Sequence, residues 1–441
     1  MAVPPMNRRR LLQAGGGLGL AGLLAACGGD DGGDDTASAP ASSAAPASSA
    51  APASSAAPAS SATPASSAAP ASSAAEAPAT SAEAGSTDAA TVAAGGGVDL
   101  QLDPASEKGA LEVFEWEGYD DKSGPFWDAY VNGPYGASNP LKYTFLENDQ
   151  QALAKIAAGF TTDVVHPCLA YTSNWIDAGL LQPWDVAEID GFDTINPRLY
   201  EAAVMDDQVY GIPWDWGYVS LVYRGDRVDP REQSWNLLLD ERYKGRIGFF
   251  TDGVDIIQVG GLINGVADPN KMSSQEIEAA KQTMIKAKKN IRVFWSVQTD
   301  AVAEMVAGNL DITYGWQDAW VTVKDELPDA DVQYMQPVEG RLAWVCGYVL
   351  MKESKRPGLA HELMKSIPTP ENALALINGY YYGAAGAGSP EVVAQVERQE
   401  LVDALGLADL EGALQAPKTW LLQYLPNRAE YVQAAEEVKA A

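Results

Sequence analysis

Carboxylates placed beside aromatic side chains occur at three points of the sequence, and this pairing is suited to binding an organic cation. Two indoles flank one carboxylate in Trp214–Trp216, and similar pairs occur at Trp116–Glu117 and Trp316–Asp318. The face of an aromatic ring attracts a cation through its quadrupole, and a carboxylate attracts it through charge. At the first point another interpretation is open, namely a tryptophan-rich core in which Asp215 caps a turn.

These three points adjoin segments with the residue pattern of β-strands. Ala110–Trp116 alternates with period two, and Leu310–Tyr314 leads into Trp316–Asp318. Trp214–Trp216 instead precedes Tyr218–Tyr223, which is rich in β-branched and aromatic residues and is predicted to be a strand. We therefore expect the paired side chains to lie at strand ends.

A further pair of carboxylates follows the predicted strand Arg246–Phe250. Asp252 and Asp255 are three residues apart, where a helix over Ile256–Leu262 is expected to begin, so both can face one side. Helix capping and compensation of the helix dipole are the alternative roles for either residue.

The order of the predicted elements is that of an open α/β sheet. A helix over Asp149–Ala158 and a short strand over Asp163–Val165 follow the first strand, and Leu342–Met351 is a later apolar strand. In such sheets ligands bind outside the carboxyl ends of the strands, so we expect a binding site there.

The first residues are typical of an export signal. Arg8–Arg10 is followed by two leucines, as in twin-arginine signals, and the apolar stretch Ala14–Ala26 is too short to span a bilayer permanently. Leu24–Cys27 resembles a bacterial lipobox, which implies that Cys27 carries the lipid and that Met1–Cys27 is a lipoprotein signal peptide. The alternative is an ordinary secreted protein. We expect the protein to be anchored to the outer face of the cytoplasmic membrane.

Residues 28–97 are of low complexity and consist mainly of alanine, serine, glycine and proline. Prolines recur every six residues from Pro40 to Pro70, and neither alanine nor serine offers enough apolar surface for a core. This segment is predicted to be a disordered tether.

Charge and cysteine usage exclude several classes of protein. The net charge of −29 and the lack of a basic patch argue against a nucleic-acid partner. Two histidines and no Cys-x-x-Cys spacing give no expectation of a structural metal, and we expect no cofactor. Cys168 and Cys346 could form a disulfide in an exported protein, but the sequence does not establish their distance.

Several spaced motifs together resemble the spermidine/putrescine-binding proteins of bacterial ABC importers. In chain order the motifs are W-E-G-Y, D-V-V-x-P, Y-G-I-P-x-x-W-G, S-W-x-x-L-x-x-x-x-Y-K-G, T-D-x-x-D, G-x-L-D-I-x-Y-x-W and E-G-x-x-x-W, within Ala110–Tyr382. The resemblance implies a two-lobed periplasmic-binding-protein fold of type II, in which two open α/β domains joined by a hinge enclose a cleft.

On this template, lobe 1 comprises residues 98–217 with 316–347, and lobe 2 comprises 218–315 with 348–441. The chain is expected to cross between the lobes near Gly217–Ser220 and Thr313–Trp316, and to return near Gly347–Met351.

The resemblance also implies the ligand-binding residues and the partners. The aromatic box falls on Trp116, Tyr119, Trp295 and Trp316, and the amine-binding carboxylates on Asp252, Asp255 and Asp318. Glu117, Cys168, Asp215, Cys346 and Tyr381 are the other expected ligand contacts. The implied ligand is a polyamine or another small organic cation, and the partners are ABC permease subunits and the membrane, through the lipid on Cys27. We expect the protein to act as a monomer.

The sequence departs from the family pattern at Cys168, Ala170 and Cys346. Because these changes leave fewer carboxylates at one end of the site, we expect a ligand that is shorter or less charged than spermidine. Asp215 and Glu117 could compensate.

Two other functions remain open at this stage. Tyr380–Tyr382 could capture ferric iron, since related binding proteins use paired tyrosines. An exported carbohydrate-active enzyme could use Asp252 and Asp318 as acid and base, but no nucleophile elbow or metal-ligand cluster accompanies them. We therefore expect a protein that is not an enzyme.

Overall fold

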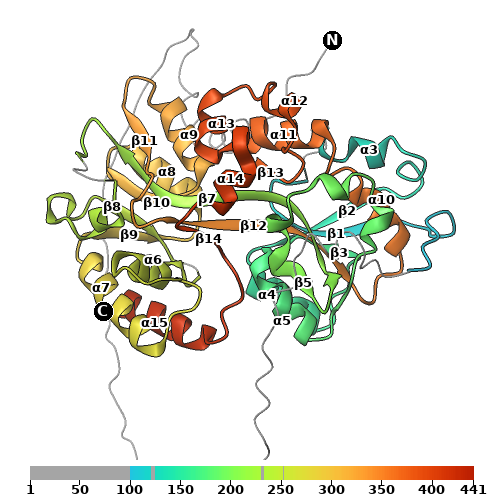
Figure 1. The fold of residues 1–441 in the computed structure, drawn as a ribbon, viewed down its shortest axis with the longest axis horizontal. Helices are drawn as coiled ribbons and strands as arrows, with labels where there is room; N and C mark the ends of the chain where they lie inside the picture. Colours follow the sequence, from blue (N-terminus) through green and yellow to red (C-terminus); the bar gives the residue numbers. More distant parts are fainter. Residues whose placement is uncertain (1–99, 121–124, 230–232, 252) are drawn as a thin grey trace, which may run out of the picture. The chain divides into compact units, whose positions relative to one another are not determined.

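A computed structural model of the protein describes residues 100–120, 125–229, 233–251 and 253–441. The expected signal peptide with Cys27, the expected tether and Asp252 lie outside the described residues. Within these residues the strands follow one another in the order β2-β1-β3-β12-β7-β10-β8-β9 (Figure 1).

One group of strands contains the first three strands of the described chain. β1, β2 and β3 are parallel, and β12 lies antiparallel to β3. Shorter strands add to β12 and β7 at the margins. The bounds are β1 Leu111–Trp116, β2 Leu141–Leu146, β3 Val164–Val165, β4 Leu181–Gln182, β12 Arg341–Met351, β13 Gly383–Ala384 and β14 Thr419–Leu421.

A second group of strands is built in the same way from later residues. β8 is parallel to both β9 and β10, and β7 lies antiparallel to β10 and β11. The bounds are β7 Gly211–Arg224, β8 Ile247–Phe250, β9 Ile291–Trp295, β10 Ile312–Gly315 and β11 Val332–Tyr334, and β5 Val204–Met205 with β6 Gln208–Val209 forms a separate hairpin.

β7 belongs to both groups of strands, and it runs beside β12 from one group to the other (Figure 1). Residues 211–219 of β7 pair with β12, and residues 220–223 pair with β10. The strand β7 therefore changes its pairing partner between Val219 and Ser220. All 14 residues of β7 are buried, as expected for a strand with packed elements on both faces.

The strand β7 is longer than the sequence analysis predicted, because it also includes Gly211–Gly217. Trp214 has no partner in the ladder where the pairing shifts between Cys346 and Gly347. This bulge accommodates Pro213, which has no N–H to donate to a regular ladder. It also requires a glycine opposite, since a Cβ atom on Gly347 would overlap the carbonyl oxygen of Ile212.

Thr313–Trp316, where the second crossing was predicted, stays with the second group of strands, and the chain returns to the first group between β11 and β12, before Gly347–Met351. The helix that follows Trp316 packs against α8, β7 and β11, and therefore stays with the second group of strands. The far end of β12 then pairs with β3 and β4 in the first group. Strand pairing therefore puts residues 316–334 with the second group and residues 348–351 with the first.

Helices cover the strands, and α6 and α9 begin shortly after the carboxyl ends of β8 and β10. α6 and α7 pack on each other, and α15 returns from β14 to pack on both (Figure 1). The bounds are α3 Asp128–Val131, α4 Asp149–Ala157, α5 Thr172–Asp177, α6 Asp255–Ile263, α7 Ser274–Lys288, α8 Gln298–Val306, α9 Gln317–Glu326, α10 Pro357–Met364, α11 Pro370–Tyr380, α12 Pro390–Val393, α13 Gln399–Leu405, α14 Leu410–Gln415 and α15 Arg428–Ala440.

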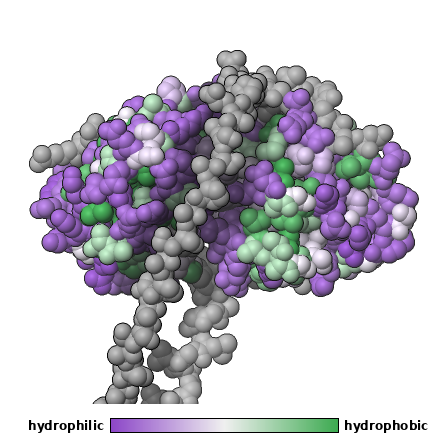
Figure 2. Space-filling view, turned by 90° about the horizontal axis from the view of Figure 1, so that it is seen from below, coloured by the Kyte–Doolittle hydropathy of each residue, from purple (hydrophilic) through white to green (hydrophobic). Residues whose placement is uncertain are grey.

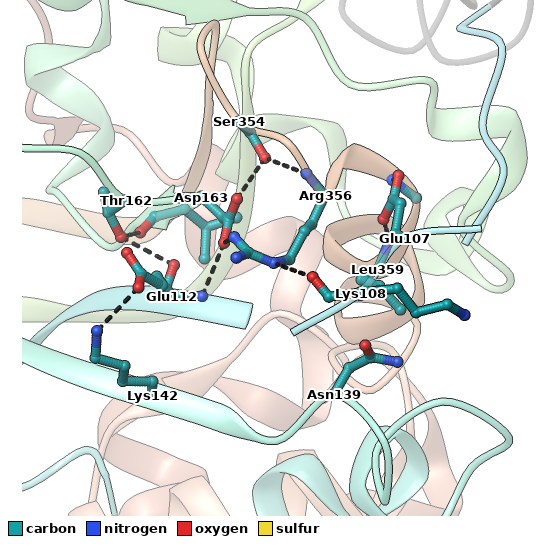
Figure 3. A network of polar contacts seen from close by, with 12 residues as sticks. Glu107, Lys108, Glu112, Asn139, Lys142, Thr162, Asp163, Ser354, Arg356 and Leu359 are labelled. Atoms are coloured by element: carbon teal, nitrogen blue, oxygen red, sulfur yellow. Dashed lines mark hydrogen bonds and ion pairs between the residues drawn. The ribbon is translucent and has the colours of Figure 1, made fainter. Parts of the chain in front are cut away.

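A polar network fixes the start of β1 (Figure 3). Both carboxylate oxygens of Glu107 accept hydrogen bonds from the backbone at the beginning of α10, at Gly358 and Leu359. Asp163, directly before β3, accepts hydrogen bonds from Ser354 and Arg356, each 2.8 Å long. Since these contacts lie where β1 and β3 begin, they are at the opposite end of both strands from the expected binding site.

The coloured surface in Figure 2 is largely hydrophilic, in agreement with the excess of acidic residues. Among the described residues, no helix has both the length and the apolar character needed to cross a membrane.

Candidate functional site

The loop after β1 brings one predicted ring, that of Tyr119, into an aromatic cluster. Trp116, at the end of β1, is half-buried, whereas Glu117 is exposed and Tyr119 is only 5% exposed. The ring of Tyr119 stacks on Tyr380 at 4.8 Å between centroids and meets Trp214 edge-on at 5.3 Å.

Asp215 lies behind Tyr119 in a buried network that connects four strands or strand ends. We call Tyr119, Asp215, His166, Glu115 and Tyr348 the histidine network. The hydroxyl of Tyr119 donates to Asp215 over 2.7 Å, and His166 lies between Asp215 at 3.0 Å and Glu115 at 2.6 Å. Tyr348 donates its hydroxyl to the other oxygen of Glu115. Asp215 therefore reaches the expected site through Tyr119.

The histidine in this network carries a positive charge. Burial alone would lower the pKa of His166, but the charges of Glu115 and Asp215 and their hydrogen bonds raise it to about 10. A buried imidazolium between two carboxylates is stable because each of its N–H groups has an acceptor. His166 directly follows the predicted strand Asp163–Val165, but the sequence analysis assigned it no role.

The two indoles beside Asp215 belong to the core, as the alternative interpretation of Trp214–Trp216 held. Both are fully buried. The indole N–H of Trp214 donates to the side chain of Asn372 over 2.7 Å, and that of Trp216 donates to the backbone carbonyl of Ala384. The ring of Trp214 therefore supports Tyr119 from behind, whereas Trp216 meets Tyr218 edge-on.

A second aromatic cluster lies at the carboxyl ends of β8, β9 and β10, where the sequence analysis placed half of the aromatic box. Trp295 and Trp316 meet edge-to-face with centroids 5.7 Å apart. Phe250 lies 5.0 Å from Trp295 and 5.3 Å from Trp316, and Tyr314 lies 6.2 Å from Trp316. We call Phe250, Trp295, Tyr314 and Trp316 the tryptophan cluster.

Two predicted carboxylates adjoin the tryptophan cluster. Asp318, in the first turn of α9, is 7% exposed and accepts a hydrogen bond of 2.6 Å from the side-chain amide of Gln298. The backbone N–H of Trp316 donates a hydrogen bond of 3.4 Å to the side-chain oxygen of Gln298. Asp255 begins α6 and accepts the hydroxyl hydrogen bond of Tyr314, and burial raises its pKa. Both carboxylates lie at helix N-termini, which favour negative charge.

The two cysteines form a disulfide, which settles a question left open by the sequence. Cys168 follows β3, and Cys346 lies in β12 directly opposite Asp215. The bond spans 178 residues of sequence and joins the loop after β3 to β12. The cysteines therefore offer no free thiol to a ligand.

The tyrosines proposed as an iron site contact three different partners. Tyr380 donates its hydroxyl to the backbone of Gly118, Tyr381 faces the guanidinium of Arg398 at 5.5 Å, and Tyr382 packs edge-on against Trp344. Among the residues that the structure describes, no group of three or more His, Cys, Asp or Glu side chains could hold a metal ion.

Sequence reasoning missed three polar residues that line one pocket, namely Asp149, Tyr171 and Arg428. Asp149 accepts a hydrogen bond of 2.9 Å from the backbone N–H of Cys168, and Arg428 lies over the ring of Tyr171 at 4.9 Å. They line one pocket together with Gln150, Leu153, Asn174 and Trp175. Burial raises the pKa of Asp149 to about 7, although His166 and Arg428 oppose the rise.

Arg428 connects this pocket to the second group of strands. Its charge opposes the rise in pKa that burial causes at Asp149 and Asp255, and burial together with these two carboxylates raises the pKa of Tyr171. These side chains therefore lie within electrostatic reach of one another, although they come from α4, a short 3-10 helix (Leu169–Tyr171), α6 and α15. No motif in the sequence pointed to Arg428, which lies in a tail that was expected to be an ordinary helix.

Comparisons with known proteins show the family and the fold of the chain. The model of a family described as bacterial extracellular solute-binding protein matches residues 141–403. The spermidine/putrescine-binding periplasmic protein of Escherichia coli is 24% identical over 238 residues, which cover 52% of this chain and 66% of that protein. The putrescine/cadaverine-binding protein of Pseudomonas aeruginosa is 23% identical, with 66% of this chain and 81% of that protein covered.

A solved structure shows the same fold. It is that of a spermidine/putrescine ABC transporter substrate-binding protein from Streptococcus pneumoniae, with a TM-score of 0.63 and 19% identity, covering 76% of this chain and 99% of that one. The predicted two-lobed fold is therefore confirmed. The match to the Escherichia coli protein spans just under two thirds of that protein's length.

Proposed function

Because the chain belongs to the family of bacterial extracellular solute-binding proteins, we propose that it captures a small organic cation for an ABC importer. The names of its relatives make polyamines the first candidates. The protein would bind the cation as a monomer in the cleft between two lobes and present it to permease subunits, without acting as an enzyme.

The observation that carries this proposal is the tryptophan cluster with Asp318 beside it. Trp295 and Trp316 present indole rings at 5.7 Å from each other, and the carboxylate of Asp318 follows two residues after Trp316. An alkylammonium group needs an anion for its charge and apolar walls for its methylenes, and this arrangement supplies both. Asp255 and Asp252 are the other carboxylates that we propose for this site.

The opposite wall of the site comes from the loop after β1. Trp116 and Tyr119 belong to this wall, and the histidine network holds Tyr119 in place from behind. We propose that Glu117, which is exposed in this structure, and the disulfide between Cys168 and Cys346 lie at the margin of the site.

The two crossing strands suggest how the cleft closes. With β7 and β12 as the connection, a small rotation within these strands would move the tryptophan cluster relative to Tyr119, in the manner of hinge-bending proteins. We propose lobes defined by strand pairing, with β1, β2 and β3 in one and β8, β9 and β10 in the other.

We further propose that the protein is exported and held at the outer face of the cytoplasmic membrane by lipid on Cys27. A Cys27→Ala variant should bind ligand normally but appear in the soluble fraction when membranes are sedimented. Retention of this variant on membranes would contradict the proposal.

Isothermal titration calorimetry with putrescine, spermidine, glycine betaine and ferric citrate tests the function. We expect at least one ammonium compound to bind, because the site pairs carboxylates with aromatic rings. Binding of ferric citrate in preference to every ammonium compound would refute the proposal, and so would the failure of every organic cation, amino carboxylates included, to bind.

A further inference from the structure

Arg428 places a fixed positive charge beside the proposed site. It is the first residue of α15, a helix that packs on α6 and α7, and its guanidinium lies over the ring of Tyr171 from the first group of strands. One of its nitrogens, Nη2, is shielded from solvent and has no hydrogen-bond partner among the described residues. A buried guanidinium N–H without an acceptor costs free energy, so an incoming acceptor would be bound favourably.

The surroundings of Arg428 leave room for such an acceptor. Asp149, Tyr171 and Asn174 line the same pocket, which has a volume of about 50 Å³. Asp149 lies within electrostatic reach, but it is not paired with Arg428 at salt-bridge distance, and its pKa of about 7 shows that it is only weakly stabilised as an anion.

We propose that Arg428 binds a carboxylate of the ligand, so that the captured cation is an ω-amino carboxylate, with its ammonium group at Asp318 and the tryptophan cluster. This inference rests on the proposed function and specifies the class of its ligand. Guanidinium groups suit carboxylates because their parallel N–H groups match the two oxygens, and stacking on Tyr171 orients this one.

A diamine fits this end of the site less well. A second ammonium group near Asp149 and Asp255 would meet the charge of Arg428, which already compensates these two carboxylates. Like charges in a partly buried site repel strongly because little water screens them. Arg428 would therefore discriminate against diamines by repulsion and favour amino carboxylates by attraction.

Asp149 gives the proposal a second, independent consequence. The charged or titratable groups that face it are His166 after β3, Tyr171 and Arg428, and Arg428 in turn faces Asp255. A ligand carboxylate beside Arg428 would raise the pKa of Asp149 further, so binding takes up a proton. The affinity for an amino carboxylate therefore falls as the pH rises from 6 through about 7 toward 9, whereas a diamine would lower this pKa and release a proton.

The test compares two probes that have the same number of carbon atoms, γ-aminobutyrate and putrescine, together with the five- and six-carbon amino carboxylates. Calorimetry on the wild type should show that at least one amino carboxylate binds more tightly than putrescine. Arg428→Gln should weaken its binding about 30-fold or more and leave putrescine unchanged or tighter. Arg242→Gln, at an exposed arginine on the surface, is the matched control and should change neither.

Three results would overturn the inference. If putrescine binds the wild type and no amino carboxylate does, the proposed function stands and this inference fails. If Arg428→Gln changes the affinity for both probes equally, Arg428 does not choose between them. If no ammonium compound binds, both proposals fail.

Asp149→Asn provides a measurement that does not depend on the folding of the Arg428 variant. Asparagine keeps the oxygen that accepts the hydrogen bond from Cys168 but cannot titrate. We expect this variant to bind the amino carboxylate with an affinity that no longer falls between pH 6 and 9. Proton uptake, measured by calorimetry in buffers of different ionisation enthalpy, should disappear with it. Unchanged proton uptake in the variant would refute the role of Asp149.

Discussion

Replacing Asp318 with asparagine is expected to weaken ligand binding by about 2–5 kcal/mol, which corresponds to a loss of affinity between about 30-fold and several thousand-fold. The carboxylate is 7% exposed and lies next to the tryptophan cluster. An ammonium group bound there has left water, so its charge must be compensated by the protein. Asparagine has the same shape but no charge, and the loss should appear as a higher Kd in calorimetry.

The local structure around position 318 should survive this change. The amide of Gln298, which donates to Asp318 over 2.6 Å, can donate equally to an asparagine oxygen. Asp300→Asn is the matched control, because Asp300 is exposed in the first turn of α8. An Asp318→Asn variant that binds every ammonium compound like the wild type would remove this residue from the site.

The sequence was sufficient to predict the order of strands and helices that position the site. Strands at Ala110–Trp116, Arg246–Phe250 and Leu310–Tyr314 were expected and occur within two residues of the predicted bounds at each end. These strands alternate or are continuously apolar, and each ends where polar or aromatic residues begin, so local patterning determines them. The tryptophan cluster follows from the same patterning, because Trp295 and Trp316 terminate or follow such strands.

Long-range pairing explains what the sequence analysis missed. Gly211–Gly217 contains a proline and two glycines and was not predicted to be strand, but β12 supplies the ladder and the bulge absorbs Pro213. The role of His166 depends on carboxylates 51 and 49 residues away. Arg428 meets Tyr171 only because α15 packs against α6 and α7. The hydrophobic pattern of a short stretch of sequence gives no information about these long-range contacts.

For Asp215, by contrast, the local sequence suggested a contact that the structure does not show. Its position between two tryptophans suggested a cation site, but the flanking indoles point into the core and the carboxylate bonds to His166 and Tyr119. In a strand, neighbouring side chains point to opposite faces, so residues adjacent in sequence do not share one pocket. The tryptophan cluster, by contrast, assembles from residues at the ends of neighbouring strands.

His166→Gln is expected to destabilise the protein by about 3–5 kcal/mol at pH 7. Among the residues that the structure describes, His166 supplies the only positive charge at ion-pair distance from the buried carboxylates of Glu115 and Asp215, and the substitution removes it. Glutamine can replace part of the hydrogen bonding but not the charge. Denaturant unfolding followed by tryptophan fluorescence measures the change in the free energy of unfolding. A double variant, Glu115→Gln with His166→Gln, restores the charge balance of the network and should recover part of the loss. No recovery would show that packing, and not charge, explains the effect.

The pH dependence separates charge from packing more sharply. The pKa of His166 is raised to about 10 in the folded protein from an ordinary value near 6.5. Its contribution to stability is therefore complete below about pH 6.5 and is lost as the pH rises toward 10. Relative to the wild type, the His166→Gln variant should be most destabilised near pH 6 and progressively less so up to pH 10.

His361 supplies the matched control for this pH profile, because it is also a buried histidine but is uncharged at neutral pH. Its ring donates to the carbonyl of Pro357 and accepts from the backbone N–H of Asp185, and burial lowers its pKa. A group with a lowered pKa changes its contribution only below about pH 6.5, so the deficit of His361→Gln should be constant from pH 7 to 10. If both variants show flat profiles over this range, the imidazole of His166 is not charged, and Tyr119 is held by hydrogen bonding alone. If only His166→Gln shows the slope, a buried ion network holds Tyr119 in place.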